Sequence, residues 1–345
     1  MRKGQFFQLR PITKRRLQKF RQHRRGWWSL WIFLTLLTLS LFAEFIANNR
    51  PLLVFYEGQL YWPVFQSYPE TTFGGEFTSE ADYQDPYVSA LIDKKGWILW
   101  PLVRYRYDTI IKDLNEPAPS APSLNHLLGT DDQARDVVAR LIYGFRVSVL
   151  FGLILTLVST MVGMAAGAIQ GYFGGKTDLI FQRLLEIWGG LPTLFILITV
   201  ASIIQPGFWT LLTVMLLFSW TWPVALVRAE FLRSRKLEYV RAARSMGASH
   251  VRIIWRHILP NASVAMLTFL PFTLASSMIM LTALDFLGLG LPVGSASLGE
   301  LLAQGKANLQ APWLGISGFV TISFMMILVM FIGEAVRHAF DPRGQ

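Results

Sequence analysis

The stretch EYVRAARSMGASHVRIIWRHILPN, residues 238–261, lies between two long apolar runs and decides how the fold is interpreted. Gly247 predicts the position just after the end of a first helix, because glycine adopts a positive φ at little cost. Pro260 predicts the end of a second helix. Between them, residues at helical spacing predict one apolar helix face: Val251, Ile254 and Ile258. We therefore expect two short helices at a membrane surface. An amphipathic connector that rests on lipid head groups would show the same pattern.

The composition of the 345-residue chain indicates a membrane protein. Hydrophobic residues make up 52% of it and charged residues 16%, whereas soluble domains carry about 25% charged residues. The net charge of +10 is concentrated in short segments beside apolar runs. This distribution is typical of membrane topology rather than of nucleic-acid binding. The absence of cysteine excludes disulfides, thiolate metal sites and a cysteine nucleophile.

Six apolar runs reach the length of ~20 residues that a transmembrane helix needs. They are Trp27–Ala47, Leu141–Ala168, Leu179–Ile204, Phe208–Ala229, Ser263–Leu284 and Trp313–Val336. With six spans every basic cluster falls on one side of the membrane, and the positive-inside rule places that side and both termini in the cytoplasm. The predicted fold class is therefore an all-α integral membrane protein with six transmembrane helices in a bundle.

The flanking charges support this topology. Residues 1–25 contain ten Lys/Arg and no Asp/Glu, and the loop from Arg228 to Arg256 contains eight Lys/Arg against two Asp/Glu. The expected organisation is a cytoplasmic basic tail (1–26), a first transmembrane helix (27–47), an external insertion (48–135) and a core with five further transmembrane helices (136–345). A basic tail that binds nucleic acid is an alternative for the first segment alone.

Glycines recur along the second apolar run, at Gly144, Gly152, Gly163 and Gly167. In a membrane, small residues let helix backbones approach closely. We therefore expect this helix to pack in the interior of the bundle.

The insertion 48–135 carries seven Lys/Arg against twelve Asp/Glu, in agreement with an external position. It is too long for a structureless loop in a compact protein. Its aromatic residues could bury a small core or could form exposed patches for a docking partner. These residues are Tyr56, Tyr61, Trp62, Tyr83, Tyr87, Trp97 and Trp100.

Charged residues inside spans mark function or packing pairs. Arg183 and Glu186 lie three residues apart on one helix face, so they form a candidate intramembrane pair, which we interpret as structural rather than as a gate. Glu44 and Asp285 lie near outer span ends and are expected to be solvated. The five histidines show no ligand spacing, which predicts no metal site.

The opening stretch resembles the coupling motif of ABC importer permeases, with the pattern Glu-Ala-Ala, three residues, Gly, nine residues, Ile-x-Leu-Pro. Matching residues are Ala242, Ala243, Gly247, Leu259 and Pro260. Arg241 stands where the family often has Glu, and His257 where it has Ile. Further stretches are similar to the peptide and nickel branch of this family: residues 127–152, GYFGG at 171–175, LDFLGLGLP at 284–292 and GEAVRHAFDPR at 333–343. The insertion and overall length resemble the E-type permeases of Yej oligopeptide importers, which are linked to microcin C uptake.

The resemblance implies a non-catalytic permease subunit of an ATP-driven oligopeptide importer in a bacterial inner membrane. Its implied partners are ABC ATPase subunits or a fused tandem ATPase, a second permease in a heterodimer, and an external solute-binding protein. ATP and magnesium would bind to the ATPase, since this chain has no GxxxxGK[ST] phosphate-binding loop. No catalytic, cofactor-binding or metal residue is expected here. The implied ATPase-coupling residues are Tyr239, Arg241, Ala242, Ala243, Gly247, Ala248, Leu259 and Pro260.

Three other classes of protein fit the sequence less well. A secondary transporter or channel subunit driven by an ion gradient predicts carboxylates near the middle of the membrane, and the sequence places no isolated carboxylate there. A membrane-embedded enzyme predicts a nucleophile paired with a base, or an HExxH motif, and neither occurs. A scaffold protein would not need an organised helix–glycine–helix element.

Overall fold

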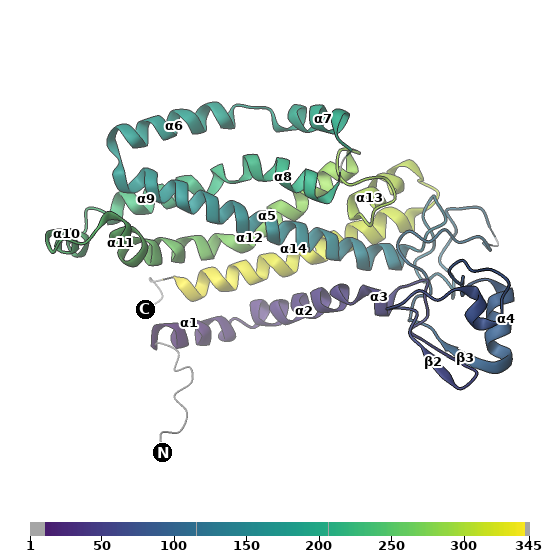
Figure 1. Cartoon of the computed structure of the whole chain (residues 1–345). Coiled ribbons are helices and arrows are strands. Elements are labelled where there is room, and N and C mark those ends of the chain that lie inside the picture. The colour runs from purple at the N-terminus through teal and green to yellow at the C-terminus, as the bar shows by residue number, and fades with distance from the viewer. Residues whose placement is uncertain (1–10, 115, 206, 342–345) are drawn as a thin grey trace, which may run out of the picture. The chain divides into compact units, whose positions relative to one another are not determined.

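The computed structural model describes residues 11–114, 116–205 and 207–341, and most of them are helical (Figure 1). Residues 1–10 of the expected basic tail, residue 115 of the expected insertion and residues 206 and 342–345 of the expected core lie outside the described residues. The chain divides into two compact units. The first consists of Met1–Leu34, Leu150–Leu281 and Phe324–Gln345, and the second of Thr35–Val149 and Thr282–Ser323.

Four long helices contribute residues to both units: α2 (Arg24–Leu41), α5 (Val137–Phe173), α12 (Leu259–Phe286) and α14 (Pro312–Phe340). The first unit also contains α1 (Pro11–Gln22), α6 (Gly175–Gly189), α7 (Thr193–Ile203), α8 (Phe208–Ser219), α9 (Thr221–Ser234), α10 (Glu238–Ser245), α11 (His250–Arg252) and the π-helix η2 (Ile253–Ile258). The second unit contains α3 (Ala43–Ile46), β1 (Leu53–Tyr56), β2 (Gln59–Tyr61), the 3₁₀-helix η1 (Glu70–Phe73), α4 (Pro86–Lys95), β3 (Gly96–Leu99) and α13 (Leu298–Ala307).

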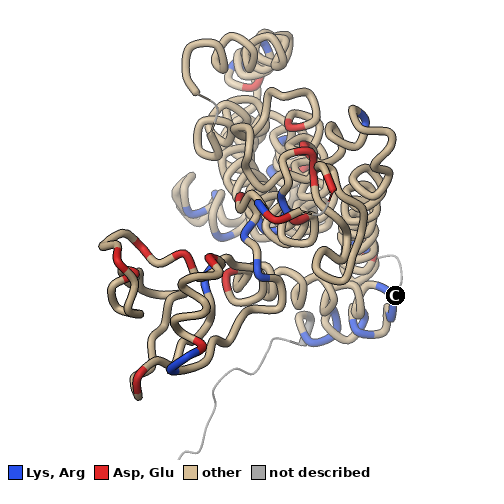
Figure 2. Tube along the Cα trace, turned by 90° about the vertical axis from the view of Figure 1, so that its right-hand side faces the viewer, with Lys and Arg blue, Asp and Glu red and all other residues tan. Residues whose placement is uncertain are grey.

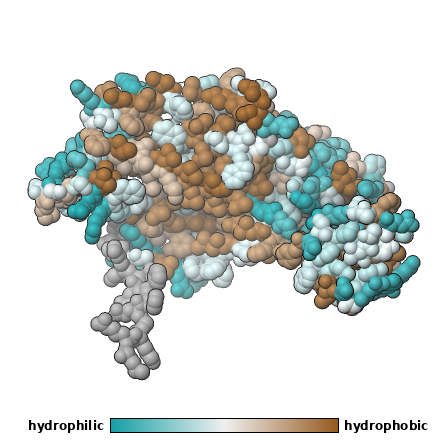
Figure 3. Space-filling model, viewed as in Figure 1, coloured by the Kyte–Doolittle hydropathy of each residue, from teal (hydrophilic) through white to brown (hydrophobic). Residues whose placement is uncertain are grey.

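Four helical segments within the described residues are long and apolar enough to cross a membrane: Val137–Phe173, Phe208–Ser234, His250–Phe286 and Pro312–Phe340. Each contains one of the expected spans. The expected first span falls on α2 and α3 and does not reach the same hydropathy, because α2 begins with two arginines and ends at Leu41. Figure 3 shows hydrophobic side chains over the long helices.

The expected third span, Leu179–Ile204, falls on two helices with a break between them. Helices α6 and α7 are bent by 63° and together make up to a fifth candidate span. The break falls at Gly190, Leu191 and Pro192. Proline lacks a backbone donor and disfavours the helical conformation of the residue before it, so the helix ends here.

In the first unit, α5 packs on α9 through three glycines spaced four residues apart. A Cβ at Gly163 would lie 2.6 Å from the Trp220 carbonyl oxygen, and one at Gly167 would lie 2.8 Å from that of Val224. A Cβ at Gly171 would lie 2.6 Å from the Arg228 carbonyl oxygen. The close approach expected from the glycines is therefore present, and it leaves no room for larger side chains.

In the second unit, the insertion contains a small antiparallel sheet with strand order β2-β1-β3, so the expected all-α class was wrong in this segment. The pair Phe55 and Trp97 is in register across β1 and β3, and their rings stack with centroids 6.0 Å apart. Helix α4 begins at Pro86, and the Asp85 carboxylate accepts a hydrogen bond from the Tyr87 N–H at 2.8 Å. Both are favourable helix-start positions for these residues.

This sheet and α4 enclose a core, which was one of the two interpretations of the insertion. The core consists of Val54, Tyr56, Phe73, Ala81, Tyr83, Val88 and Ile92. Tyr61 and Trp100 are partly buried against it, whereas Trp62, Tyr87 and Trp97 are exposed. Figure 2 shows acidic and basic positions along the chain of this segment, and Figure 3 shows hydrophilic side chains on the face turned to the viewer. The insertion therefore folds around a small core, and its surface carries polar residues together with several exposed aromatic side chains.

Candidate coupling site

Residues 238–260, here called the coupling loop, begin with α10, which buries one face. Val240 and Ala243 are 1% and 2% exposed, because residues three apart share a helix face. Tyr239, Arg241 and Ala242 lie on the exposed faces. Of the two alanines that match the coupling motif, Ala242 is therefore the exposed one, and Ala243 is packed in the core.

Gly247 ends α10 as predicted. Its φ is +81°, a conformation that costs glycine little and other residues about 1–2 kcal/mol. The Gly247 N–H donates to the Arg244 carbonyl at 3.0 Å, and the Ala248 N–H donates to the Ala243 carbonyl at 3.1 Å. These two bonds form a Schellman motif, which fixes the direction of the chain after α10.

The second helix of the loop does not end at Pro260, so that prediction was wrong. Helix α11 begins at the N-cap Ser249 and continues through η2 into α12. The Leu259 N–H donates to the Ile254 carbonyl, five residues back, which is the π-helical pattern. Since the wider turn directly precedes Pro260, the proline ring and its missing donor are accommodated where the helix already departs from α geometry.

The apolar face of this second helix also differs from the prediction. Ile253 and Ile258 are fully buried, Ile254 is partly buried, and Val251 is 66% exposed. The π-turn shifts the helical register by one residue, so the spacing of an ideal α-helix selected Val251 instead of Ile253. Leu259 is partly buried, and Pro260 is exposed.

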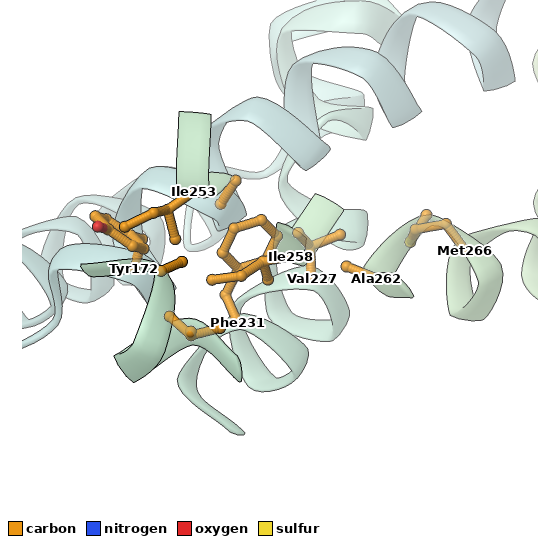
Figure 4. Packing of buried hydrophobic residues seen from close by; sticks show 10 residues of the cluster. Tyr172, Val227, Phe231, Ile253, Ile258, Ala262 and Met266 are labelled. Atoms are coloured by element: carbon orange, nitrogen blue, oxygen red, sulfur yellow. The ribbon is translucent and has the colours of Figure 1, made fainter. Parts of the chain in front are cut away.

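One buried cluster in the first unit packs the coupling loop against α5, α9 and α12 (Figure 4). Its members are Ala168, Tyr172, Val227, Phe231, Val240, Ala243, Ile253, Ile258, Ala262 and Met266. Tyr172 and Ile253 lie at one end of the cluster and Met266 at the other (Figure 4). Because these residues come from α5, α9, α10, η2 and α12, the loop and the ends of these helices form one packed body.

The free surface of the loop is both apolar and basic. Met246, Val251 and Trp255 are 81%, 66% and 67% exposed. Beside them lies a hollow of about 320 Å³, lined by Ala243, Met246, Ala248, Arg252, Arg256 and His257. Exposed apolar side chains next to a hollow and arginines are typical of a protein-binding surface.

Two ion pairs lie on α6. Arg183 donates to Glu186 at 2.5 Å, and both side chains are more than half exposed. The Arg228 side chain of α9 binds both oxygens of Asp178 at 2.5 and 2.7 Å. The spacing of three residues predicted the first pair but not the second, whose residues are 50 positions apart. The acidic residue Asp178 in the first turn of α6 was the signal for the second pair.

A buried ionic cluster in the second unit was also missed. Asp131 and Arg140 are fully buried and paired, and Arg135 donates to Asp131 at 2.7 Å. Glu300 of α13 accepts from Arg135 at 3.2 Å and from Arg140 at 2.9 Å. Burial and the neighbouring Asp131 raise the pKa of Asp132. Arg135 lies in the stretch 127–152 that resembles the family, but no local pattern indicates its partner Glu300, which lies 165 residues away.

Glu44 and Asp285 were expected to be simply solvated, and this prediction was wrong, because both have partners within the protein. Arg146 donates to both oxygens of Glu44 at 2.9 and 3.0 Å. Asp285 is 8% exposed and accepts hydrogen bonds from the Leu291 N–H at 2.7 Å and the Ser297 hydroxyl at 2.5 Å. It thereby closes the turn that follows α12.

In the part of the chain that the structure describes, no group of three His, Asp or Glu side chains lies close enough together to hold a metal ion. The coupling loop likewise presents arginines and apolar side chains rather than a nucleophile paired with a base. Its geometry suits contact with another protein.

Residues 159–344 match the family described as the binding-protein-dependent transport system inner membrane component. This chain belongs to that permease family. Residues 13–63 of the permease also match the N-terminal TM domain of oligopeptide transport permease C. The coupling loop lies within the first match, and residues 64–158, with most of the insertion, lie outside both.

Relatives of known name agree with this assignment. The permease is 55% identical over 334 residues to the inner membrane ABC transporter permease protein YejE of Escherichia coli, covering 97% of this chain and 98% of that one. It is 54% identical over 357 residues to the peptidoglycan transport system permease protein YejE of Agrobacterium fabrum, covering 96% and 93%. The oligopeptide transport system permease protein OppC of Lactococcus lactis is 34% identical over 254 residues, covering 70% and 86%. The resemblance to Yej permeases is confirmed.

A solved structure supports the fold. The inward-facing MetNI methionine ABC transporter aligns with a TM-score of 0.50 at 15% identity, covering 59% of the permease and 96% of that chain. At this identity the likeness concerns the fold alone. The permease thus shares its helical architecture with an ABC importer.

Proposed function

We propose that this permease carries peptides inward as one membrane subunit of an ATP-driven importer, and that its coupling loop receives the movement of an ATPase. The observation that carries the proposal is the exposed α10 turn, seated on α5, α9 and α12 by one buried cluster. The names of relatives support the cargo class, since one refers to oligopeptides and another to peptidoglycan, a polymer that contains peptides.

The proposed topology has six spans with both termini in the cytoplasm of a bacterial cell. Helix α2 with α3 would form the first span and the bent α6–α7 pair the third. The ten Lys/Arg among residues 1–25 and the basic loop around α10 support this orientation. The insertion 48–135 would then face outward, in agreement with its excess of acidic residues.

The proposed partners follow from the family. An ABC ATPase pair or a fused tandem ATPase would bind ATP and magnesium and contact the coupling loop. A second permease would complete the translocation pathway, and an external solute-binding protein would deliver the peptide. The chain itself is proposed to bind no cofactor and to catalyse no reaction.

The insertion is the proposed docking region for the solute-binding protein. It holds a hollow of about 900 Å³ whose walls carry both signs of charge, including Arg50, Glu80, Asp82, Arg104 and Asp113. Polar, mixed-charge surfaces suit transient protein contacts that must open in each cycle. This placement rests on the proposed topology.

Transport would proceed by rigid-body movement. When the ATPases close, they would displace the coupling loop, and the buried cluster would pass this displacement to the helices on which the loop is seated. Rocking of the paired permeases would then expose the pathway to each side in turn.

Replacing Ala242 by tryptophan tests the proposal. Ala242 is exposed, so the larger side chain should leave the fold intact and obstruct a partner in close contact with α10. We expect the affinity for the ATPase to fall at least about tenfold, which corresponds to ~1.4 kcal/mol. ATP-dependent peptide uptake into proteoliposomes should fall with it.

The matched control is Ala90→Trp, at an exposed alanine of α4 in the insertion. This variant should retain the ATPase in co-purification. If Ala242→Trp binds the ATPase and transports peptide as well as the wild type does, the coupling role of α10 is contradicted.

A further inference from the structure

The side chain of Tyr172 connects the end of α5 to the coupling loop. It is 3% exposed, and its hydroxyl lies 2.7 Å from Nδ1 of His250, the first residue of α11. Nη2 of Arg244, on α10, donates to the same hydroxyl at 3.4 Å, and its guanidinium lies over the ring at 5.8 Å from the centroid. One phenol group therefore contacts both short helices of the loop.

The backbone of Tyr172 is held as well. Nη1 of Arg235, the residue that ends α9, donates to the Tyr172 carbonyl at 3.2 Å. This carbonyl is among the last four of α5, so no backbone N–H of that helix can donate to it. The end of α5 is thus tied to α9 and to both parts of the coupling loop.

The hydrogen-bond roles follow from the chemistry of the groups. An arginine can only donate, so the phenol oxygen accepts from Arg244. The contact between the phenol hydroxyl and Nδ1 of His250 is a hydrogen bond whose donor depends on the imidazole tautomer. The chain of polar contacts runs Arg244, Tyr172, His250.

Helix α5 cannot easily move independently of α9. The glycine contacts at Gly163, Gly167 and Gly171 bring the two backbones together along about two turns. A displacement of α10 and α11 must therefore either move α5 and α9 together or break the contacts that join the loop to these helices, which include those of Tyr172. The strength of those contacts decides which of the two occurs.

We infer that Tyr172 is a positioning residue whose hydroxyl transmits movement of the coupling loop to α5. The aromatic ring packs in the buried cluster and holds the fold, whereas the hydroxyl links the loop to the helix during the stroke. This inference rests on the proposed function and adds the residue through which the stroke enters a membrane helix.

Tyr172→Phe separates these roles, because it keeps the ring and removes the hydroxyl. The purified complex of permease, partner permease and ATPases, reconstituted with the solute-binding protein, should keep its ATPase content and hydrolyse ATP. Peptide transported per ATP should fall about fivefold, the scale of one lost hydrogen bond. His250→Ala removes the contact between the imidazole and the hydroxyl and should also lower transport per ATP. The double variant should be no worse than Tyr172→Phe alone, because Tyr172→Phe already removes that contact together with the one to Arg244.

Tyr143→Phe is the matched control. Tyr143 lies on the same helix, in the part that belongs to the second unit. The substitution removes its buried hydroxyl, which donates to the Ala47 carbonyl at 2.9 Å. Its transport per ATP should equal that of the wild type. His250→Gln, which offers an acceptor oxygen to the phenol, should recover part of the loss seen in His250→Ala.

Two results would overturn the inference. One is an unchanged ratio of transport to ATP hydrolysis in Tyr172→Phe. The other is a parallel loss of ATPase content and transport, which indicates that the hydroxyl only holds the fold. Failure of the proposed function is separate, because the wild-type complex itself would then show no ATP-driven uptake.

Discussion

Replacing Asp131 by asparagine is expected to destabilise the permease by about 3–5 kcal/mol, the usual cost of removing one partner from a buried ion pair. Asp131 is fully buried and pairs with Arg135 and Arg140. Without its charge, the ion pairs that remain to Arg135 and Arg140, whose side chains are 3% and 0% exposed, are those with Glu300. An uncompensated buried charge costs more than the pair contributes, so we expect a large effect.

The measurement is the thermal unfolding midpoint of the detergent-solubilised permease, followed by size-exclusion chromatography. Asp131→Asn should unfold well below the wild type and accumulate less in the membrane. Asp93→Asn, at an exposed position on α4, is the control and should leave the midpoint unchanged. Equal midpoints for wild type and Asp131→Asn would show that the ionic cluster is not a main support of the second unit.

Gly167→Leu is expected to separate α5 from α9. The first added carbon alone would lie 2.8 Å from the Val224 carbonyl oxygen and 2.9 Å from the Val227 Cβ. Overpacking costs typically 1–3 kcal/mol where side chains can adjust, and here a backbone atom must move. Because α9 leads directly into the coupling loop, we expect less assembled complex with the ATPase as well as lower stability.

The measurement combines the unfolding midpoint with the amount of ATPase that co-purifies. Gly189→Leu is the control: it lies in α6, and an added Cβ would meet no atom within 4 Å. A Gly167→Leu variant with wild-type stability and ATPase content would contradict the close packing of α5 on α9.

The sequence predicted those features that depend on neighbouring residues. Gly247 at the end of α10 and the glycine stripe of α5 follow from local rules, because a positive φ and close helix approach both require the smallest residue. The pair of Arg183 with Glu186 follows from spacing on one helix face. The Gly247 position and the Arg183–Glu186 pair could each be read from fewer than ten consecutive residues, and the glycines of α5 from one continuous apolar run.

The features that were missed depend on contacts between distant segments or on unusual helix geometry. Glu300 reaches Arg135 across 165 residues, and Asp178 reaches Arg228 across 50, so no local pattern signals either pair. The π-turn before Pro260 changes the helical register, which a fixed period of 3.6 cannot anticipate. The sheet of the insertion was missed because its strands are only three or four residues long.

Site-specific photo-crosslinking tests the coupling-loop assignment most directly. The chain has no cysteine, so a single introduced thiol can carry the crosslinker without further changes. Met246 is 81% exposed at the turn after α10, and Phe65 is 70% exposed in the insertion. Met246→Cys and Phe65→Cys, each labelled with a benzophenone maleimide in the assembled transporter, form the test pair. The account predicts that Met246→Cys crosslinks to the ATPase subunit and Phe65→Cys does not. Crosslinking of Met246→Cys to lipid alone, with no ATPase adduct, would contradict it.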